Sequence, residues 1–200
     1  MKRLSTIFVA LALLALLPAF ASDFTEVPNS ASHDGKYAAR TERSTDAQDG
    51  RDYLSLYRKG TGEVFTRLPI GGYARYPMDA DPANLQILWS PDSKHFVLMV
   101  RGMKRSWAVV VYAIGTKGVR EVKLPSPTTE ALALLSASGI VRVARETPSK
   151  WIDDDHLLLR ASGDTLIDGK SIWYEVDLTF SLRGGNITES KVVTKKPYEG

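Results

Sequence analysis

The most informative segment for the fold is Trp89-Ser90-Pro91-Asp92-Ser93-Lys94, at residues 89–94. Serine at the start of a turn accepts backbone hydrogen bonds, proline presets φ at the next position, and aspartate suits the third. The apolar run FVLMV at 96–100 follows at once, and its aromatic and β-branched residues favour a strand. The sequence therefore predicts a tight connection that leads into a buried strand.

A similar turn occurs twice more, as SHDGK at 32–36 and as IDDDH at 152–156. Aligning Asp34, Asp92 and Asp154 places the three copies 58 and 62 residues apart, and puts Trp89 and Trp151 just before the second and third turns. Each copy then continues into a strand and a second strand with a tyrosine, which is Tyr57, Tyr112 or Tyr174. Such self-similarity predicts a repeat architecture.

Most of the remaining pattern also predicts strands. Short runs rich in β-formers lie between Gly, Pro, Asp and Ser at residues 37–39, 53–57, 108–112, 157–159 and 172–176. The segments GTG at 60–62 and GTKG at 115–118 are typical of hairpin turns. One stretch favours a helix instead: Ser126 is a candidate N-cap, Pro127 suits the first turn, and residues 130–138 are rich in Ala and Leu. Residues 140–143 are strand-like again.

On these residues the chain resembles the blade repeat of TolB-like and dipeptidyl-peptidase-type β-propellers. The resemblance rests on the WSPDSK turn, the apolar strand after it, the strand ending in Val111-Tyr112, and the Gly-Thr turn. The match is good in the second copy, fair in the first and partial in the third, where Asp153 replaces the proline. It implies blades made of β-meanders, in proteins that act mainly as interaction platforms or substrate gates.

We therefore expect an all-β domain of propeller-like antiparallel β-meander repeats with one short helix, in units of about residues 30–70, 85–125 and 148–197. Blades usually repeat at about 40–50 residues and a closed propeller needs at least four, whereas these three units are longer and carry an insertion at residues 42–52. Four arrangements stay open: an incomplete propeller, a curved stack of three meanders, a half that pairs with another copy, or a sandwich that reuses the turn.

Residues 1–21 have the basic start, apolar run and A-x-A ending of a cleaved signal peptide. We expect residues 22–200 to form one periplasmic or secreted domain without a stable membrane anchor. Loss of Lys2 and Arg3 lowers the formal net charge from +3 to +1, and no basic cluster with interleaved aromatics predicts nucleic-acid binding. The chain has no cysteine, which excludes disulfides and cysteine-ligated zinc. Asn186-Ile187-Thr188 would be a glycosylation acceptor in a eukaryotic secretory route.

Two acidic segments are candidate metal sites. Asp153-Asp154-Asp155-His156 combines carboxylates with an imidazole, but the repeat makes it a hairpin turn first. Residues 46–52 run D-x-x-D-G-x-D and do not satisfy the D-x-[DN]-x-[DN]-G calcium template. We therefore expect no metal site and no cofactor. We expect Asp92→Ala and Asp154→Ala to destabilise the fold by about 1 kcal/mol each through lost turn hydrogen bonds.

Catalytic signatures are weak. Ser136-Ala137-Ser138-Gly139 lacks the first glycine of G-x-S-x-G, and the chain is too short for a second catalytic domain. The three histidines fall at different places, at His33, His95 and His156. Four tryptophans could form a sugar-stacking surface: Trp89, Trp107, Trp151 and Trp173. Trp89 and Trp151 occupy matching repeat positions that predict a core role, and Trp107 is the least explained.

We expect a non-catalytic protein-interaction module that binds another envelope or secreted protein, through insertions such as residues 43–51 and 73–78. Assembly with further copies of itself also stays open. The alternatives are a small ligand-binding protein or hydrolase with a pocket where the units converge, and a structural envelope subunit.

Overall fold

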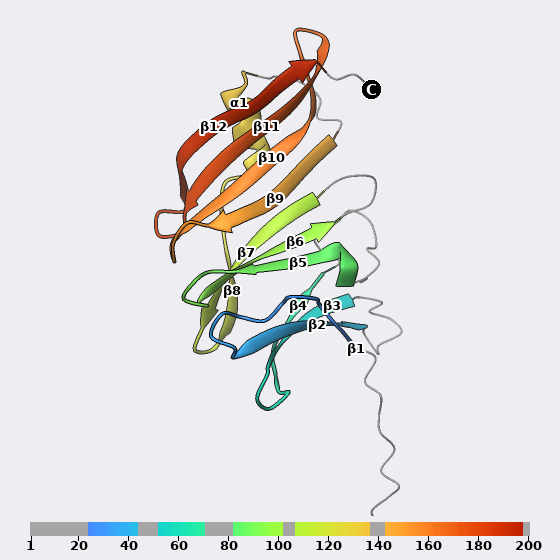
Figure 1. Ribbon diagram of the computed structural model, residues 1–200, viewed down its shortest axis with the longest axis vertical. Helices are drawn as coiled ribbons and strands as arrows, with labels where there is room; N and C mark the ends of the chain where they lie inside the picture. Colours follow the sequence, from blue (N-terminus) through green and yellow to red (C-terminus); the bar gives the residue numbers. More distant parts are fainter. Residues whose placement is uncertain (1–23, 44–51, 71–81, 102–106, 137–142, 198–200) are drawn as a thin grey trace, which may run out of the picture.

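The computed structural model describes residues 24–43, 52–70, 82–101, 107–136 and 143–197 (Figure 1). The predicted signal peptide at residues 1–21 lies outside the described residues. So do most of the acidic loop at 46–52, residues 73–78, and residues 137–139 of the serine-containing string.

Twelve strands form three antiparallel meanders of four strands each (Figure 1). Meander 1 contains β1 (Phe24–Glu26), β2 (Tyr37–Arg43), β3 (Asp52–Arg58) and β4 (Val64–Pro69). Meander 2 contains β5 (Leu85–Trp89), β6 (His95–Arg101), β7 (Trp107–Gly115) and β8 (Gly118–Val122), with the 3-10 helix η1 (Pro82–Asn84) ahead of it. Meander 3 contains β9 (Val143–Trp151), β10 (His156–Ile167), β11 (Lys170–Ser181) and β12 (Asn186–Pro197). The expected all-β fold with antiparallel meanders is confirmed.

The predicted helix is also present, as α1 (Pro127–Leu134), between meanders 2 and 3. The Ser126 hydroxyl accepts a hydrogen bond from Thr129 N, and Pro127 occupies the first turn, where a missing N–H costs nothing. The helix therefore begins at the expected cap but ends at Leu134, before the expected limit at Gly139.

The meanders stack face to face, and β6 shows why (Figure 1). Its alternating side chains are buried on both faces, because Phe96 and Leu98 join one apolar core with meander 1 while Val97 joins another with meander 3 and α1. A strand that is buried on both faces must lie between two layers. Meander 2 is therefore the middle layer of three.

Meanders 2 and 3 also share a sheet edge. The outer edge of β7 pairs with β8 from Val111 to Gly115, while Trp107 at the other end of β7 makes a parallel pair with Arg145 of β9. This contact joins the two meanders into an eight-stranded sheet, whereas meander 1 is a separate four-stranded sheet.

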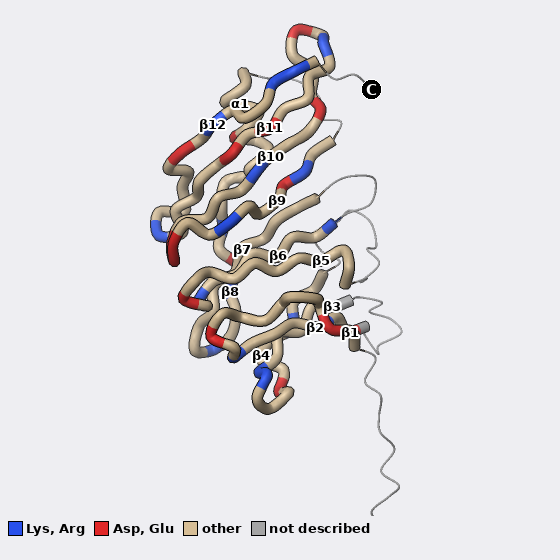
Figure 2. Tube along the Cα trace, in the orientation of Figure 1, with Lys and Arg blue, Asp and Glu red and all other residues tan. Residues whose placement is uncertain are grey.

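Ion pairs lie on the faces of meanders 1 and 3 that point away from the two apolar cores, and Figure 2 shows where the charged residues fall along these strands. On meander 1, Glu42 accepts ion pairs from Arg40 at 2.8 Å and Arg67 at 3.0 Å. On meander 3, Arg160 bonds Asp177 at 2.7 Å. Terminal repeats with polar outer faces cap a stack, so the described residues match the incomplete propeller and the curved stack among the four arrangements.

The structure corrects the predicted equivalence of Tyr174 with Tyr57 and Tyr112. Tyr57 and Tyr112 lie opposite Ala38 and Phe96, the second residues of β2 and β6. Phe180 holds that position in meander 3, opposite Leu157, whereas Tyr174 lies opposite Gly163. The equal sequence offset is misleading because β10 and β11 form a longer hairpin with only Asp168 and Gly169 between them.

Candidate functional site

The first two repeat turns are nearly identical in atomic detail. Ser90 Oγ donates to Asp92 Oδ1 at 2.7 Å, and the same carboxylate accepts from Lys94 N at 3.0 Å and pairs with Lys94 Nζ at 3.1 Å. Ser32, Asp34 and Lys36 repeat these contacts at 2.7, 3.1 and 2.9 Å. Burial opposes ionisation of Asp92, but the hydrogen bonds from Lys94 and Ser90 outweigh it and lower its pKa. These residues hold turns together.

The third turn uses a different aspartate from the one that the alignment predicted. Asp153 Oδ1 accepts from Asp155 N and His156 N, each at 2.8 Å, and its carboxylate contacts His156 Nδ1 at 2.9 Å. Asp153, not Asp154, is therefore the counterpart of Asp92. Its turn is one residue tighter, closing from Ile152 N to His156 O rather than from Ser90 N to His95 O.

Two carboxylates of the acidic turn have partners within the protein. Asp155 is engaged by Arg183 Nε at 2.6 Å, and Asp153 by the turn itself. Within the described ranges, no three His, Asp or Glu side chains are grouped so that they could hold a metal ion.

The three histidines lie at three different turns. His33 Nε2 lies 3.3 Å from the carbonyl of Trp89, and His156 contacts Asp153. The His95 ring stacks on Trp151, with 6.0 Å between ring centroids, and burial lowers the pKa of His95. No hydrogen bond joins a histidine ring to a serine hydroxyl in the part of the chain that the structure describes, so the histidines do not assemble a serine–histidine pair there.

Trp107, which the sequence left unexplained, belongs to one cluster with Trp173 and two arginines. The guanidinium of Arg145 lies 5.5 Å from the Trp107 ring centroid and 5.7 Å from that of Trp173. Arg101 lies over the Trp107 ring at 5.6 Å. We call these four residues the arginine–tryptophan ladder: Arg101, Trp107, Arg145 and Trp173.

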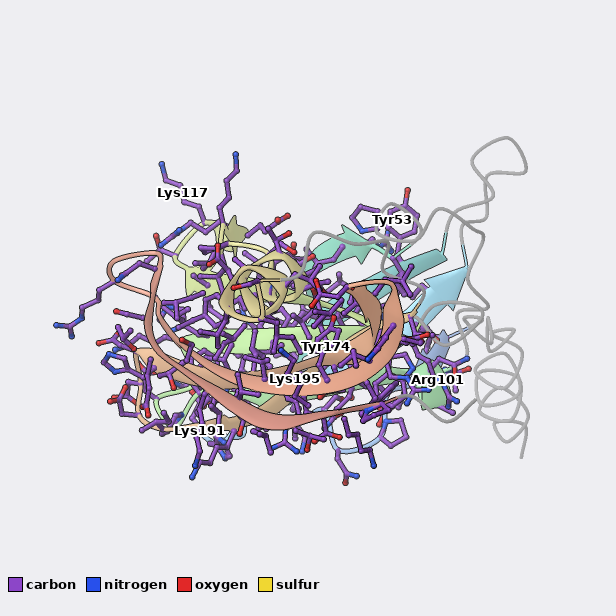
Figure 3. All side chains as sticks on the ribbon, turned by 90° about the horizontal axis from the view of Figure 1, so that it is seen from above. Tyr53, Arg101, Lys117, Tyr174, Lys191 and Lys195 are labelled. Carbon is purple, nitrogen blue, oxygen red and sulfur yellow. The ribbon has the colours of Figure 1, made fainter. Side chains whose placement is uncertain are left out.

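Strand pairing positions the ladder. Arg101 is opposite Trp107 across β6 and β7, and Trp107 is opposite Arg145 where β7 meets β9. Arg101 is exposed, and the other three members are half-buried. Figure 3 shows Arg101 at the opposite end of the molecule from Lys117 of the β7–β8 turn. Because the ladder joins residues from four strands, no local sequence pattern could have revealed it.

A second feature is a cavity of about 250 Å³ where β7, β8, β9 and the start of α1 meet. Its lining residues include the apolar Val109, Val111, Val122, Leu124 and Leu159, and Glu121 and Glu146 are its two acidic members. Glu146 Oε1 accepts hydrogen bonds from Thr128 Oγ1 at 2.8 Å and Thr128 N at 3.2 Å. The first turn of α1 therefore fixes this carboxylate.

Tyr174 lies on the side of meander 3 that faces α1 (Figure 3). Its ring is fully buried, and its hydroxyl has no hydrogen-bond partner among the described residues. Burial, with a contribution from the charge of Glu146, raises the pKa of Tyr174 to about 12.

Comparison with known proteins gives weak structural similarities only. No family profile and no curated protein sequence matches the chain. Among solved structures, TolB from Acinetobacter baumannii is similar over 89% of this chain and 55% of its own, with 12% identity and a TM-score of 0.24. The C-terminal domain of YpeB from Bacillus megaterium is similar over 88% of this chain and 92% of its own, with 10% identity and a TM-score of 0.18. The chain thus spans about half the length of that TolB.

No helix in the described ranges has the length and apolar character that a membrane crossing requires.

Proposed function

We propose that the protein is an exported, non-catalytic protein-interaction module and that the arginine–tryptophan ladder is its contact surface. Export rests on the signal-peptide pattern of residues 1–21. The observation that carries the contact surface is the stacking of Arg101 and Arg145 on Trp107, at 5.6 and 5.5 Å.

Residue chemistry favours this surface. Tryptophan and arginine are enriched among the few residues that dominate binding energy in protein interfaces. A stacked guanidinium also loses little side-chain entropy on binding, because the ring already restricts it. The ladder therefore offers rigid side chains that combine apolar area with charge.

The charge of the ladder is not neutralised within the described part of the chain. Arg40, Arg58 and Arg160 each form an ion pair with a carboxylate, whereas neither Arg101 nor Arg145 forms one with a described residue. Buried Arg145 Nε likewise has no hydrogen-bond partner there. A partner that presents carboxylates would supply the missing acceptors.

The test compares two arginine variants of the tagged full chain in cross-linked cells that produce it. Arg101→Ala removes the exposed member of the ladder. Arg58→Ala is the matched control, because Arg58 also lies over an aromatic ring, Phe65 at 5.3 Å, but in meander 1. We expect the control to retain a partner protein at the wild-type level and Arg101→Ala to reduce its recovery on the order of tenfold.

Two results would contradict the proposal. Equal recovery of the partner with both variants would exclude the ladder as the contact surface. Recovery of the protein alone with the wild-type chain would exclude the interaction module itself.

A further inference from the structure

We propose that the cavity between meander 2, meander 3 and α1 is a binding site for a small alkylammonium group, with Glu146 as the counter-ion. This inference is independent of the ladder, since the two sites share no residue.

The volume of the cavity and its apolar lining residues indicate the size and character of the apolar part of the ligand. At about 30 Å³ for each water-sized unit, a volume of about 250 Å³ holds roughly eight non-hydrogen atoms. Valine and leucine side chains from β7, β8 and β10 form much of the lining. A short alkyl chain fits both observations, because it gains by leaving water for an apolar wall.

Glu146 indicates the charge of the ligand. Both hydrogen bonds from Thr128 go to Oε1, so Oε2 has no hydrogen-bond partner among the described residues. The lining residues include no lysine or arginine. Glu146 also forms no ion pair within the described ranges, unlike Glu42, Glu63 and Glu175 elsewhere in the fold. A half-buried carboxylate held in place without a cation is suited to an ammonium group.

Tyr174 lies on the same face of meander 3 as Glu146, because strand pairing sets it opposite Gly163 and Gly163 opposite Ala144, two residues before Glu146. The ring of Tyr174 is fully buried, and its hydroxyl is unpartnered among the described residues. The cavity therefore combines the carboxylate of Glu146 with apolar side chains.

The test uses n-hexylammonium as the probe and n-hexanol as its neutral analogue. The purified protein is titrated with each while its valine and leucine methyl resonances are followed by NMR. We expect n-hexylammonium to shift the resonances of Val109, Val111 and Leu159, and n-hexanol to leave them in place at the same concentration.

Glu146→Gln is the decisive variant. Glutamine keeps an oxygen that can accept from Thr128, so the fold is preserved while the charge is lost. We expect it to weaken n-hexylammonium binding on the order of tenfold. Glu189→Gln, on the exposed strand β12, is the matched control and should bind as the wild type does.

A lysine-containing tripeptide with blocked ends identifies the source of the ammonium group. If the tripeptide binds more strongly than n-hexylammonium, the proposal is supported with a lysine side chain of a protein as the ligand. If n-hexylammonium binds more strongly, the proposal is supported with a free amine as the ligand. Equal binding of n-hexanol, or unchanged affinity in Glu146→Gln, would overturn the proposal, as would no shift with any probe.

Discussion

The indole Nε1 of Trp89 donates a 2.8 Å hydrogen bond to the backbone carbonyl of Ser30. Trp151 repeats the contact one meander later, donating to the carbonyl of Leu88 at 3.0 Å. Ser30 and Leu88 are equivalent positions, because each stands two residues before the serine that opens a repeat turn. Each tryptophan thus joins its own meander to the same point of the preceding one, and the stack is held together by a repeated hydrogen bond.

Trp89→Phe should therefore destabilise the protein by about 1–3 kcal/mol. Phenylalanine keeps most of the ring but removes the N–H, which leaves the carbonyl of the buried residue Ser30 without this donor. Urea unfolding followed by circular dichroism measures the effect. Trp151→Phe should lower the free energy of unfolding by less than Trp89→Phe does, because Trp151 is only half-buried. An unchanged free energy of unfolding in Trp89→Phe would show that this bond does not stabilise the stack.

The third turn distinguishes two neighbouring aspartates. Asp153→Ala should lower the free energy of unfolding more than Asp154→Ala does, because the Asp153 carboxylate accepts two backbone hydrogen bonds. Asp154→Ala should change the free energy of unfolding by less than about 0.5 kcal/mol, as is usual for a surface substitution away from such contacts. Thermal unfolding of both variants checks this, with Asp92→Ala as the reference at about 1 kcal/mol. If Asp154→Ala loses more stability than Asp153→Ala, Asp154 is the counterpart of Asp92, as the sequence alignment predicted.

His95 should make stability depend on pH. Burial, together with the charge of Arg120, lowers its pKa from 6.5, against the opposing influence of Asp92 and Asp155. A lowered histidine pKa favours the neutral form in the folded state, so its contribution is complete above about pH 6.5 and is lost as the pH falls towards the folded pKa. His95→Gln should flatten the decline of the free energy of unfolding just below pH 6.5. If the free energy of unfolding of His95→Gln falls as steeply below pH 6.5 as that of the wild type, other titratable groups cause the pH dependence.

Tyr174→Phe should leave the fold as stable as the wild type or stabilise it by up to about 1 kcal/mol, because it removes a buried hydroxyl that has no described partner. Chemical denaturation measures the difference. A loss of more than about 1 kcal/mol would mean that this hydroxyl makes a stabilising hydrogen bond in solution.

Gly163→Ala should be strongly destabilising, by about 2 kcal/mol or more. A Cβ at this position would overlap the backbone carbonyl of Val143 and crowd the Tyr174 hydroxyl. Unlike a side chain, the paired β9 backbone cannot move aside cheaply. Gly60→Ala, where the added Cβ meets no atom within 4 Å, is the matched control for unfolding measurements. Similar stability of the two variants would contradict this close packing.

Local chemistry explains which elements could be predicted. The serine–aspartate turns, the Gly-Thr hairpin turns and the Ser126 cap each depend on residues within six positions of one another, so their hydrogen bonds can be anticipated from residue type. The apolar runs predict strands because short runs of β-branched and aromatic residues between turn residues are typical of strands buried on both faces. The alignment was wrong only where the third copy departs from the motif, at Asp153 and Tyr174.

The repeated turn, the succession of strands and the position of the helix follow from the sequence alone, since each rests on contacts between near neighbours in the chain. The contacts of Trp107 with Arg145, and of Glu146 with Thr128 at the cavity, arise only when the meanders pack together. Those contacts join residues 18 or more positions apart, and they depend on how the meanders stack. Many stackings would bury the same apolar faces, so the neighbours of a polar side chain are set by the packing of whole layers.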